Sequence, residues 1–243
     1  MARAGVRAGL AACALLVLLA GCDSPWSDDD DRIETARDFP PADRPVAPVG
    51  ATKWSTEEAR DRVNEAEDIM DSSGVRPGMT VADIGAGDGY YTVRLAARVG
   101  AGGRVLAQDI QPEVIERLAD RVARERLDNV SLKLGAVDDP RLPQNSFDRV
   151  FMVHMYHEIG EPYAFLWRLR PALRQGGQVI VVDGDRPIEK HGTPFRLLVC
   201  EFEAVGYKLL SYDDKQTAGG YLARFVPAGQ RPEPGAIKVC ENP

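Results

Sequence analysis

Short apolar runs alternate with segments of helical periodicity along most of the chain. Runs rich in β-branched and other apolar residues predict strands at residues 80–83, 104–108, 130–134, 147–153 and 178–183. Apolar residues three and four positions apart predict helices at residues 91–99, 112–126, 163–173 and 194–205. The run at 147–153 is nearly continuous, as is typical of a strand buried on both faces. This alternation predicts a parallel sheet with helices on both of its faces.

Both ends of this alternating region carry their own signals. Ser55 and Glu58 have the spacing of a capping box, with Ser55 as N-cap, and predict a helix that runs to about Ser72. At the other end, residues 208–212 and 221–225 predict two strands close enough in sequence to form a hairpin. The hairpin implies that one strand of the sheet is antiparallel.

The stretch VADIGAGDGYY, residues 81–91, joins the first predicted strand to the next helix through three glycines. Gly85, Gly87 and Gly89 stand at alternate positions, so a nucleotide-like ligand can lie against bare backbone. A dinucleotide-binding loop has the pattern G-x-G-x-x-G, which would require the third glycine at position 90. That position is Tyr90, and the spacing therefore argues against a nicotinamide cofactor.

The pattern Asp83-x-Gly85-x-Gly87-x-Gly89 resembles the first motif of class I S-adenosylmethionine (SAM)-dependent methyltransferases. The resemblance covers roughly residues 53–226. It implies an α/β, Rossmann-like, doubly wound and mostly parallel seven-stranded sheet, whose antiparallel last strand lies between strands five and six. It also implies SAM as the cofactor.

Ligands of open parallel sheets bind beyond the carboxyl ends of the strands, so the residues that follow each strand are candidates. Asp109 is placed to accept hydrogen bonds from both ribose hydroxyls, or it is a helix-initiating acid ahead of Pro112. Many members of the family carry an acid directly after the glycine equivalent to Gly135, where this chain has Ala136. Asp138 or Asp139 can take over the contact to the adenine, with Val137 on its face; the alternative is a solvated turn. The expected cofactor-binding residues are Asp83, Gly85, Ala86, Gly87, Gly89, Asp109, Ile110, Val137 and Asp138.

A second cluster of polar residues, His154, Tyr156, His157 and Glu158, follows the fourth strand. It resembles a subset of small-molecule methyltransferases with Tyr-His-His or Tyr-His-Glu at this point. The resemblance implies His157 as the base that deprotonates the acceptor, Tyr156 and Glu158 as orienting or acceptor-binding groups, and His154 beside the transferred methyl group. The alternative is that one of the two histidines is a hydrogen-bonded core residue.

A divalent metal held by His157, Asp183 and Asp185 is a further interpretation of the same region. A lone histidine with two aspartates and no tight spacing is a weak signal, so no metal is expected. Residues 183–191 are polar and rich in turn formers, and we expect them to rim the acceptor site.

The N-terminus is typical of a targeting segment. Arg3 and Arg7 precede an apolar run at residues 10–20, which is too short to span a bilayer. The run ends in Leu19-Ala20-Gly21-Cys22, which resembles a bacterial lipoprotein box; an ordinary signal peptide is the alternative. The resemblance implies cleavage before Cys22, a lipid anchor on its sulfur, and a domain on the periplasmic face of a membrane in the cell envelope.

These features divide the chain into a lipoprotein signal peptide (1–21), a lipidated cysteine with a disordered Asp/Pro-rich tether (22–52), and a methyltransferase-like domain (53–243). The domain ends in a Pro/Gly-rich tail from residue 227. An oxidising compartment favours a disulfide between Cys200 and Cys240; the alternative is two unpaired thiols.

The charge of the chain limits the classes of partner that it is expected to bind. The chain has 37 Asp and Glu residues against 30 Lys and Arg, and no cluster of basic residues, which argues against a nucleic-acid partner. A small-molecule acceptor is therefore expected, and the lipid anchor is the only expected contact with a membrane.

SAM is a cytoplasmic metabolite, which conflicts with an exported domain, and three hypotheses follow. The enzyme uses SAM in the periplasm; the fold is a catalytically inactive module that binds a nucleoside-like ligand or a partner protein; or the N-terminus is misread and the protein is cytoplasmic. A pure scaffold has no physical need for Gly85, Gly87 and Gly89, so an active methyltransferase is the favoured hypothesis.

Overall fold

The computed structural model describes residues 1, 32–50 and 56–242 of the 243-residue chain. The elements below all belong to one compact unit that begins at Ile33. The expected signal peptide beyond Met1 and the expected lipid anchor at Cys22 lie outside the described residues. In the described part, no helix has the length and apolar character that crossing a membrane requires.

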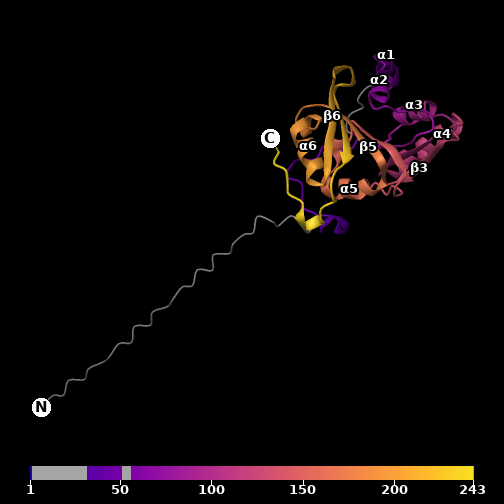
Figure 1. Cartoon of the computed structure of the whole chain (residues 1–243). Coiled ribbons are helices and arrows are strands. Elements are labelled where there is room, and N and C mark those ends of the chain that lie inside the picture. Colours follow the sequence, from indigo (N-terminus) through magenta and orange to yellow (C-terminus); the bar gives the residue numbers. More distant parts are fainter. Residues whose placement is uncertain (2–31, 51–55, 243) are drawn as a thin grey trace. The chain divides into compact units, whose positions relative to one another are not determined.

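This unit is built on a seven-stranded sheet with the order β3-β2-β1-β4-β5-β7-β6 (Figure 1). Strands β1 to β5 pair in parallel, and β7 is antiparallel to both of its neighbours. The doubly wound sheet with an antiparallel strand between the fifth and sixth is thus confirmed. Its strands are β1 Thr80–Ile84, β2 Arg104–Asp109, β3 Val130–Leu134, β4 Phe147–Val153, β5 Leu173–Asp183, β6 Tyr207–Lys215 and β7 Gly220–Pro227.

Helices cover both faces because side chains of a strand alternate between the faces. Val81 lies in the core cluster of α2 and α3, whereas Ala82 lies in the cluster of α5 and α6. Leu118 of α4 packs on Ala107 of β2. The helices are α1 Glu57–Arg62, α2 Glu65–Ser72, α3 Tyr90–Val99, α4 Pro112–Arg124, α5 Pro162–Leu169 and α6 Phe195–Ala204.

The single helix expected from Ser55 to Ser72 is two helices. Thr56 is the N-cap of α1, and its side chain accepts a hydrogen bond from the Ala59 N–H; Ser55 lies outside the described residues. The helix breaks at Asn64, which has a left-handed backbone with φ of 54°. This break turns the Glu65 carboxylate into the protein, where Arg60 binds it through two hydrogen bonds of 2.6 and 3.0 Å.

Residues 33–50, which we call the N-terminal strap, belong to the domain, although their composition predicts a disordered tether. Ala36 and Phe39 are buried in the main core, and Phe39 contacts the ring of Trp167 edge-on at 5.5 Å. Arg44 forms a fully buried ion pair of 2.7 Å with Glu201 of α6. The prolines of the strap exclude a regular element, but long-range contacts order it nevertheless.

The strap contacts a connection of the sheet that lacks a helix. No helix connects β3 to β4, and residues 135–146 make this connection as an irregular segment. Asp138 in this segment accepts a hydrogen bond of 2.6 Å from Thr35 of the strap and forms an ion pair with Arg168 of α5. The strap therefore packs against the irregular segment that stands where a regular doubly wound fold has a crossover helix.

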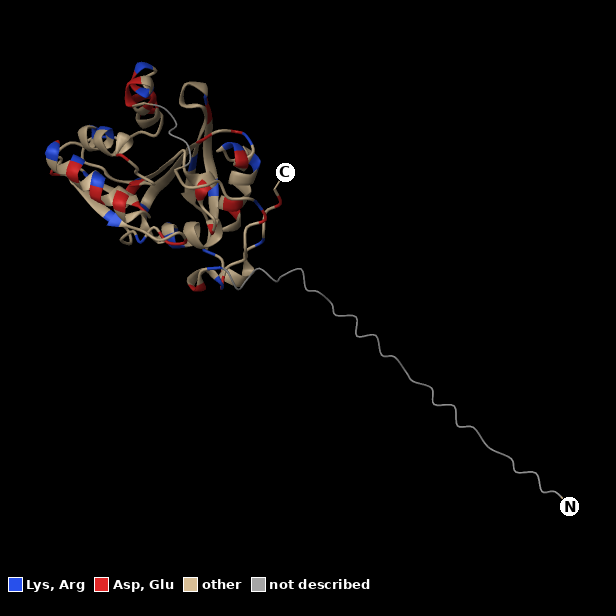
Figure 2. Cartoon of the chain, turned by 180° about the vertical axis from the view of Figure 1, so that it is seen from behind, with Lys and Arg blue, Asp and Glu red and all other residues tan. Residues whose placement is uncertain are grey.

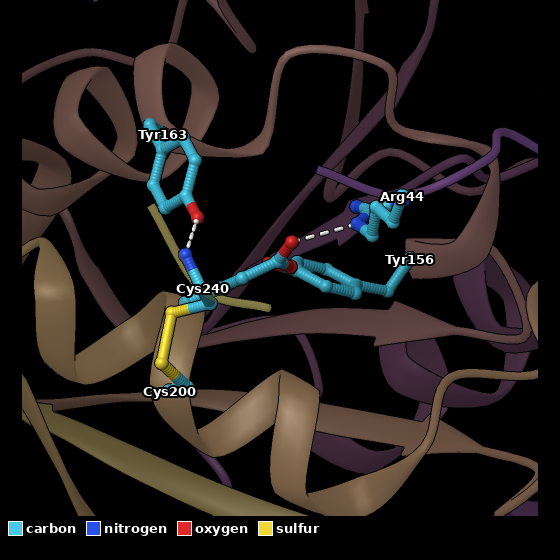
Figure 3. The surroundings of a disulfide bond; sticks show 6 residues. Arg44, Tyr156, Tyr163, Cys200 and Cys240 are labelled. Carbon is cyan, nitrogen blue, oxygen red and sulfur yellow. Dashed lines mark hydrogen bonds and ion pairs between the residues drawn. A yellow bond between two sulfur atoms is a disulfide. The ribbon is translucent and has the colours of Figure 1, made fainter. Parts of the chain in front are cut away.

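The C-terminal tail is held on the domain by a disulfide between Cys200 of α6 and Cys240 (Figure 3). The Cys240 N–H donates a hydrogen bond of 2.7 Å to the Tyr163 hydroxyl. Trp167 donates to the Pro232 carbonyl at 2.8 Å. The Pro/Gly-rich tail is thus held at several points, one of them the disulfide that the sequence favours.

Charged residues of both signs are interspersed over the helices (Figure 2). Several form ion pairs between neighbouring helices, as between Arg94 of α3 and Asp61 of α1 at 2.6 Å. The surface of the helical layer is thus a mixture of charges, in keeping with the modest net charge of −7.

Candidate functional site

A cavity of about 600 Å³ lies at the carboxyl ends of β1, β2 and β4, where the topology of an open α/β sheet predicts a ligand site. The glycine loop and the end of β2 line one part of it, and the segment after β4 lines another. The strap closes it with Val46, Val49 and Gly50. Further lining residues include Gly85, Gly87, Asp88, Gln108, Asp109, Ile110, Ala136, Val137, His154, Met155 and Glu158.

The three glycines of the loop have different functions. Gly85 and Gly87 line the cavity in left-handed conformations with φ of 66° and 55°. A Cβ at Gly85 would lie 3.0 Å from Met155, whereas a Cβ at Gly87 would meet no atom closer than 4.0 Å. Gly89 does not line the cavity; it is the N-cap of α3, where a Cβ would lie 2.5 Å from Leu118. Gly89 therefore serves helix packing, and the other two leave room for a ligand.

Asp83 and Ala86, also expected at the cofactor, lie beneath the loop and do not line the cavity. The Asp83 carboxylate accepts a hydrogen bond of 2.6 Å from Thr92. Burial raises the pKa of Asp83 to about 6, against the opposing effect of that hydrogen bond. Ala86 packs on Ala107 and Leu118, and its N–H donates to the Gln108 carbonyl. Both residues position the loop from below.

Asp109 ends β2 and lines the cavity beside Ile110, as expected for a ribose-binding acid. One carboxylate oxygen accepts a hydrogen bond of 3.1 Å from the Gly87 N–H and the other accepts one of 3.1 Å from the Gln111 N–H. The carboxylate thus connects the glycine loop to the start of α4. Each carboxylate oxygen has a second lone pair, which remains for a ligand hydroxyl.

The expected adenine contacts are only partly present. Val137 lines the cavity, and its side chain is half exposed. Asp138 is buried against Arg168 and Thr35, so its carboxylate serves the strap and does not face the cavity. Asp139 accepts a hydrogen bond from the Arg141 N–H in its own turn. The expectation that Asp138 replaces the missing acid is therefore wrong.

Gln108 is a cavity residue that the sequence analysis missed. Its side chain is 1% exposed, and its Nε2 has no hydrogen-bond partner among the described residues. A Cβ at Gly135 would lie 1.8 Å from that Nε2, so the glycine after β3 leaves room for the amide. An unpaired buried amide is costly, and a bound ligand can satisfy it. Its position next to Asp109, at the end of β2, was the sequence feature that could have identified it as a cavity residue.

His154 lines the cavity directly after β4, in a left-handed conformation with φ of 54°. Its Nε2 lies 3.8 Å from the Glu65 carboxylate, which the sequence analysis did not consider. Burial raises the pKa of Glu65, but the nearby His154 ring and the hydrogen bonds from Arg60 outweigh it and lower the pKa to about 2. The ionised Glu65 carboxylate therefore lies beside the His154 ring.

Tyr156 is not an acceptor-binding residue. Its side chain is fully buried in the core, and its hydroxyl donates a hydrogen bond of 2.7 Å to Glu201, which also pairs with Arg44 (Figure 3). A short 3₁₀ turn, Tyr156–Glu158, points the tyrosine inward against Phe202. The Tyr-His-Glu sequence motif thus contributes one residue to the core.

The next two residues of the turn diverge. His157 does not line the cavity; its Nδ1 lies 3.0 Å from the Asp183 carboxylate, in a buried pair. Glu158 does line the cavity and accepts a hydrogen bond of 3.0 Å from the Gly50 N–H of the strap. Burial raises the pKa of Glu158, and the Gly50 bond opposes this. His157 is therefore not placed to act directly on an acceptor in the cavity.

The metal set weighed from the sequence, His157 with Asp183 and Asp185, does not assemble. Asp183 contacts the histidine directly, and Asp185 accepts a hydrogen bond of 2.9 Å from the Phe195 N–H at the start of α6. Among the described residues, His157, Glu158 and His191 lie together at this place instead.

Comparison with known proteins supports the interpretation of the cavity. Residues 81–177 match the model of a methyltransferase domain. The chain is 32% identical over 142 residues to a protein-L-isoaspartate O-methyltransferase of Methanothrix thermoacetophila, a match that covers 58% of this chain and 62% of the relative. It is 30% identical over 115 residues to a ubiquinone/menaquinone biosynthesis C-methyltransferase of Hydrogenovibrio crunogenus, covering 47% and 45%. The chain thus spans less than two thirds of either relative.

Among solved structures, a SAM-dependent methyltransferase from Aquifex aeolicus superimposes with a TM-score of 0.60 at 23% identity. The match covers 70% of this chain and 97% of the other, which shows a shared fold. The glycine loop, β2 with Asp109 and all of β4 fall inside the matched domain. Residues 81–177 therefore match a methyltransferase domain, within a sheet that shares its fold with a SAM-dependent methyltransferase.

Proposed function

We propose that this protein is a SAM-dependent methyltransferase that acts on a small-molecule acceptor. One observation carries the proposal: the open backbone of Gly85 and Gly87 and the carboxylate of Asp109 meet at one cavity of about 600 Å³. The volume suits a nucleoside cofactor together with a small acceptor. The methyltransferase domain match supports the same cofactor.

A nicotinamide dinucleotide fits this loop less well. Tyr90 stands where a dinucleotide loop has its third glycine, and it is the first residue of α3, with its side chain buried. The pyrophosphate of a dinucleotide needs a close approach to that helix start. SAM has no phosphate and makes no such demand.

Methyl transfer places simple demands on the protein. The nucleophilic atom of the acceptor forms a bond to the methyl carbon while the carbon–sulfur bond breaks, and S-adenosylhomocysteine leaves with the electron pair. The protein has to hold the three atoms in line and exclude water. We place the acceptor beside His154 and Glu158, because these side chains line the cavity beyond β4. The strap residues Val46 and Val49 provide an apolar wall for it.

We propose further that the mature protein is anchored through a lipid at Cys22 on the periplasmic face of an envelope membrane. The lipoprotein-like sequence Leu19–Cys22 and the Cys200–Cys240 disulfide support this location. A membrane-bound domain meets lipid-soluble acceptors, and one relative is named for ubiquinone/menaquinone biosynthesis. A Cys22→Ser variant should move from the membrane fraction to the soluble fraction; an unchanged fractionation would contradict the anchor.

The cofactor proposal is tested by equilibrium dialysis of methyl-labelled SAM against the purified protein and two variants. In Asp109→Asn, one side-chain oxygen remains to accept the hydrogen bond from the glycine loop, but the charged acceptor is lost. A hydrogen bond to a charged group contributes about 1.5–3 kcal/mol. We expect SAM affinity to fall about 10- to 150-fold. Asp120→Asn removes an exposed acid of α4 as the matched control and should bind like the parent. Equal binding by all three would contradict the proposed cofactor site.

Binding and catalysis are separated by a second measurement on the same samples. Small molecules and membrane lipid extracts are screened as acceptors, and transfer of the label to any of them would support methyltransferase activity. Binding of SAM without transfer to any of them would favour the alternative, a module that binds a nucleoside-like ligand.

A further inference from the structure

Two histidines and a glutamate converge beside the cavity, where the segments after β4 and β5 meet. His157, Glu158 and His191 each offer one ligand atom, and these three atoms lie within 4.8 Å of one another. The histidine rings are in edge-to-face contact, with centroids 5.5 Å apart. His191 lies more than 30 positions from the other two in the chain, so the fold assembles the cluster and sequence spacing does not reveal it.

A buried carboxylate fixes the first histidine. Asp183 at the end of β5 is fully buried and contacts Nδ1 of His157 at 3.0 Å. It also accepts hydrogen bonds from the Thr193 hydroxyl at 2.7 Å and from the Gly184 N–H at 2.9 Å. With Nδ1 engaged, Nε2 of His157 remains as the ligand atom. Histidine ligands of metals typically have a carboxylate in this outer position, because it fixes the tautomer and the ring.

The loop after β5 fixes the backbone of the second histidine. His191 ends a 3₁₀ turn, Ile188–Lys190, in a left-handed conformation with φ of 54°. Its carbonyl accepts two hydrogen bonds from the Arg186 guanidinium, at 2.8 and 3.1 Å. Its Nδ1 is buried and has no hydrogen-bond partner among the described residues. A buried ring nitrogen without a partner carries a free-energy cost that a bound ligand can remove.

We propose that His157, Glu158 and His191 bind a divalent transition-metal ion of the zinc type. Two imidazoles and one carboxylate are a ligand set that zinc uses with a fourth position left open. The negative charges of Glu158 and Asp183 balance the charge of the ion. Nitrogen ligands favour zinc over magnesium, which prefers oxygen ligands.

The geometry requires a modest contraction. Ligand atoms about 2.1 Å from a tetrahedral ion lie about 3.4 Å from one another. The present separations of up to 4.8 Å close through side-chain rotation of His191 and Glu158, while Asp183 holds His157 in place. Because Glu158 also lines the cavity, a molecule bound there with an oxygen donor can reach the open position of the ion.

The test is calorimetric titration of the purified full chain with Zn²⁺ alone, with Mg²⁺ as the comparison ion. We expect one high-affinity Zn²⁺ site per chain that Mg²⁺ does not fill. His191→Asn removes the imidazole, and asparagine tolerates the left-handed backbone; zinc affinity should fall at least about tenfold. Asp183→Asn weakens the outer support and should lower the affinity by about 10- to 100-fold.

His154→Asn is the matched control, because His154 has the same φ of 54° but does not belong to the cluster. This variant should bind Zn²⁺ like the parent. All variants carry the same cysteines, so zinc binding by thiolates would not differ among them. The proposal is overturned if the parent shows no stoichiometric zinc site, if His191→Asn binds as tightly as the parent, or if His154→Asn loses affinity to the same extent.

Discussion

Replacing Gly87 by alanine separates the backbone function of the glycine loop from its function in ligand binding. Gly87 has a φ of 55°, and the added methyl group would meet no atom closer than 4.0 Å. The left-handed conformation costs alanine about 1–2 kcal/mol, partly offset by a less flexible unfolded chain. We expect the free energy of unfolding to fall by about 1 kcal/mol, which lowers the Tm by about 2–4 °C for a domain of this size.

The same methyl group occupies room that the proposed cofactor needs, because Gly87 lines the cavity. Crowding of a close contact by one methyl group costs about 1–3 kcal/mol. The Kd for SAM should therefore rise about 5- to 150-fold. The measurements are scanning calorimetry for the Tm and titration calorimetry for the Kd.

Gly100 offers a matched control. It ends α3 with a φ of 66°, has open space around its Cβ position, and does not line the cavity. Its ψ of −172° makes this conformation almost confined to glycine, so Gly100→Ala should lower the Tm at least as much as Gly87→Ala and leave SAM affinity unchanged. If Gly87→Ala bound SAM as tightly as Gly100→Ala, the loop would not contact the cofactor and the reasoning would fail.

Three further substitutions test other parts of the structure. Glu65→Gln breaks a buried ion pair and should lower the free energy of unfolding by about 3–5 kcal/mol at pH 7. The pKa of Glu65 in the folded protein is about 2, below its ordinary value of 4.5. The difference in urea stability between the parent and this variant should therefore vanish as pH falls toward 2. Tyr156→Phe removes the hydroxyl that donates to Glu201 and should cost about 1–2 kcal/mol while leaving SAM affinity unchanged. Replacing Cys200 and Cys240 together by serine removes a link across a 40-residue separation and should cost at most about 4 kcal/mol, with earlier proteolysis of the tail.

Each of these has a contrary outcome. A pH-independent cost of Glu65→Gln would contradict the ionised, hydrogen-bonded state of Glu65. A large loss of SAM affinity in Tyr156→Phe would indicate that Tyr156 does take part in ligand binding. An unchanged Tm in the double serine variant would mean that the tail is held by its other contacts, such as the Trp167 hydrogen bond.

Local patterns were sufficient to predict the sheet and the position of the glycine loop. Strands at 130–134 and 147–153 have the predicted bounds, because β-branched and apolar runs flanked by turn formers are strong local signals. The positions of Gly85, Gly87 and Asp109 in the cavity follow from topology alone, since ligands of such sheets bind beyond the carboxyl ends of the strands.

The strap was not predictable from local composition. Its prolines and charges are typical of a flexible tether, but Ala36 and Phe39 are buried by residues more than 100 positions away in the chain. Val46 and Val49 line the cavity for the same reason. Contacts of this range leave no periodic signal, so the cavity wall that they form was missed.

The segment after β4 shows the limit of a motif. The chain around Tyr156 and Glu158 is a 3₁₀ turn, so neighbouring side chains point in different directions. Glu158 lines the cavity, whereas Tyr156 is buried in the core and His157 contacts Asp183. A sequence motif fixes residue types, whereas the turn that decides their directions depends on the residues packed behind it.

The most direct test of the central claim is calorimetric titration of the purified protein with SAM, S-adenosylhomocysteine and NAD. The cavity at Gly85, Gly87 and Asp109 predicts micromolar binding of the first two and no binding of NAD. Binding of none of the three would contradict the assignment of this cavity to SAM. Binding of NAD alone would contradict methyl transfer and favour hydride transfer as the reaction.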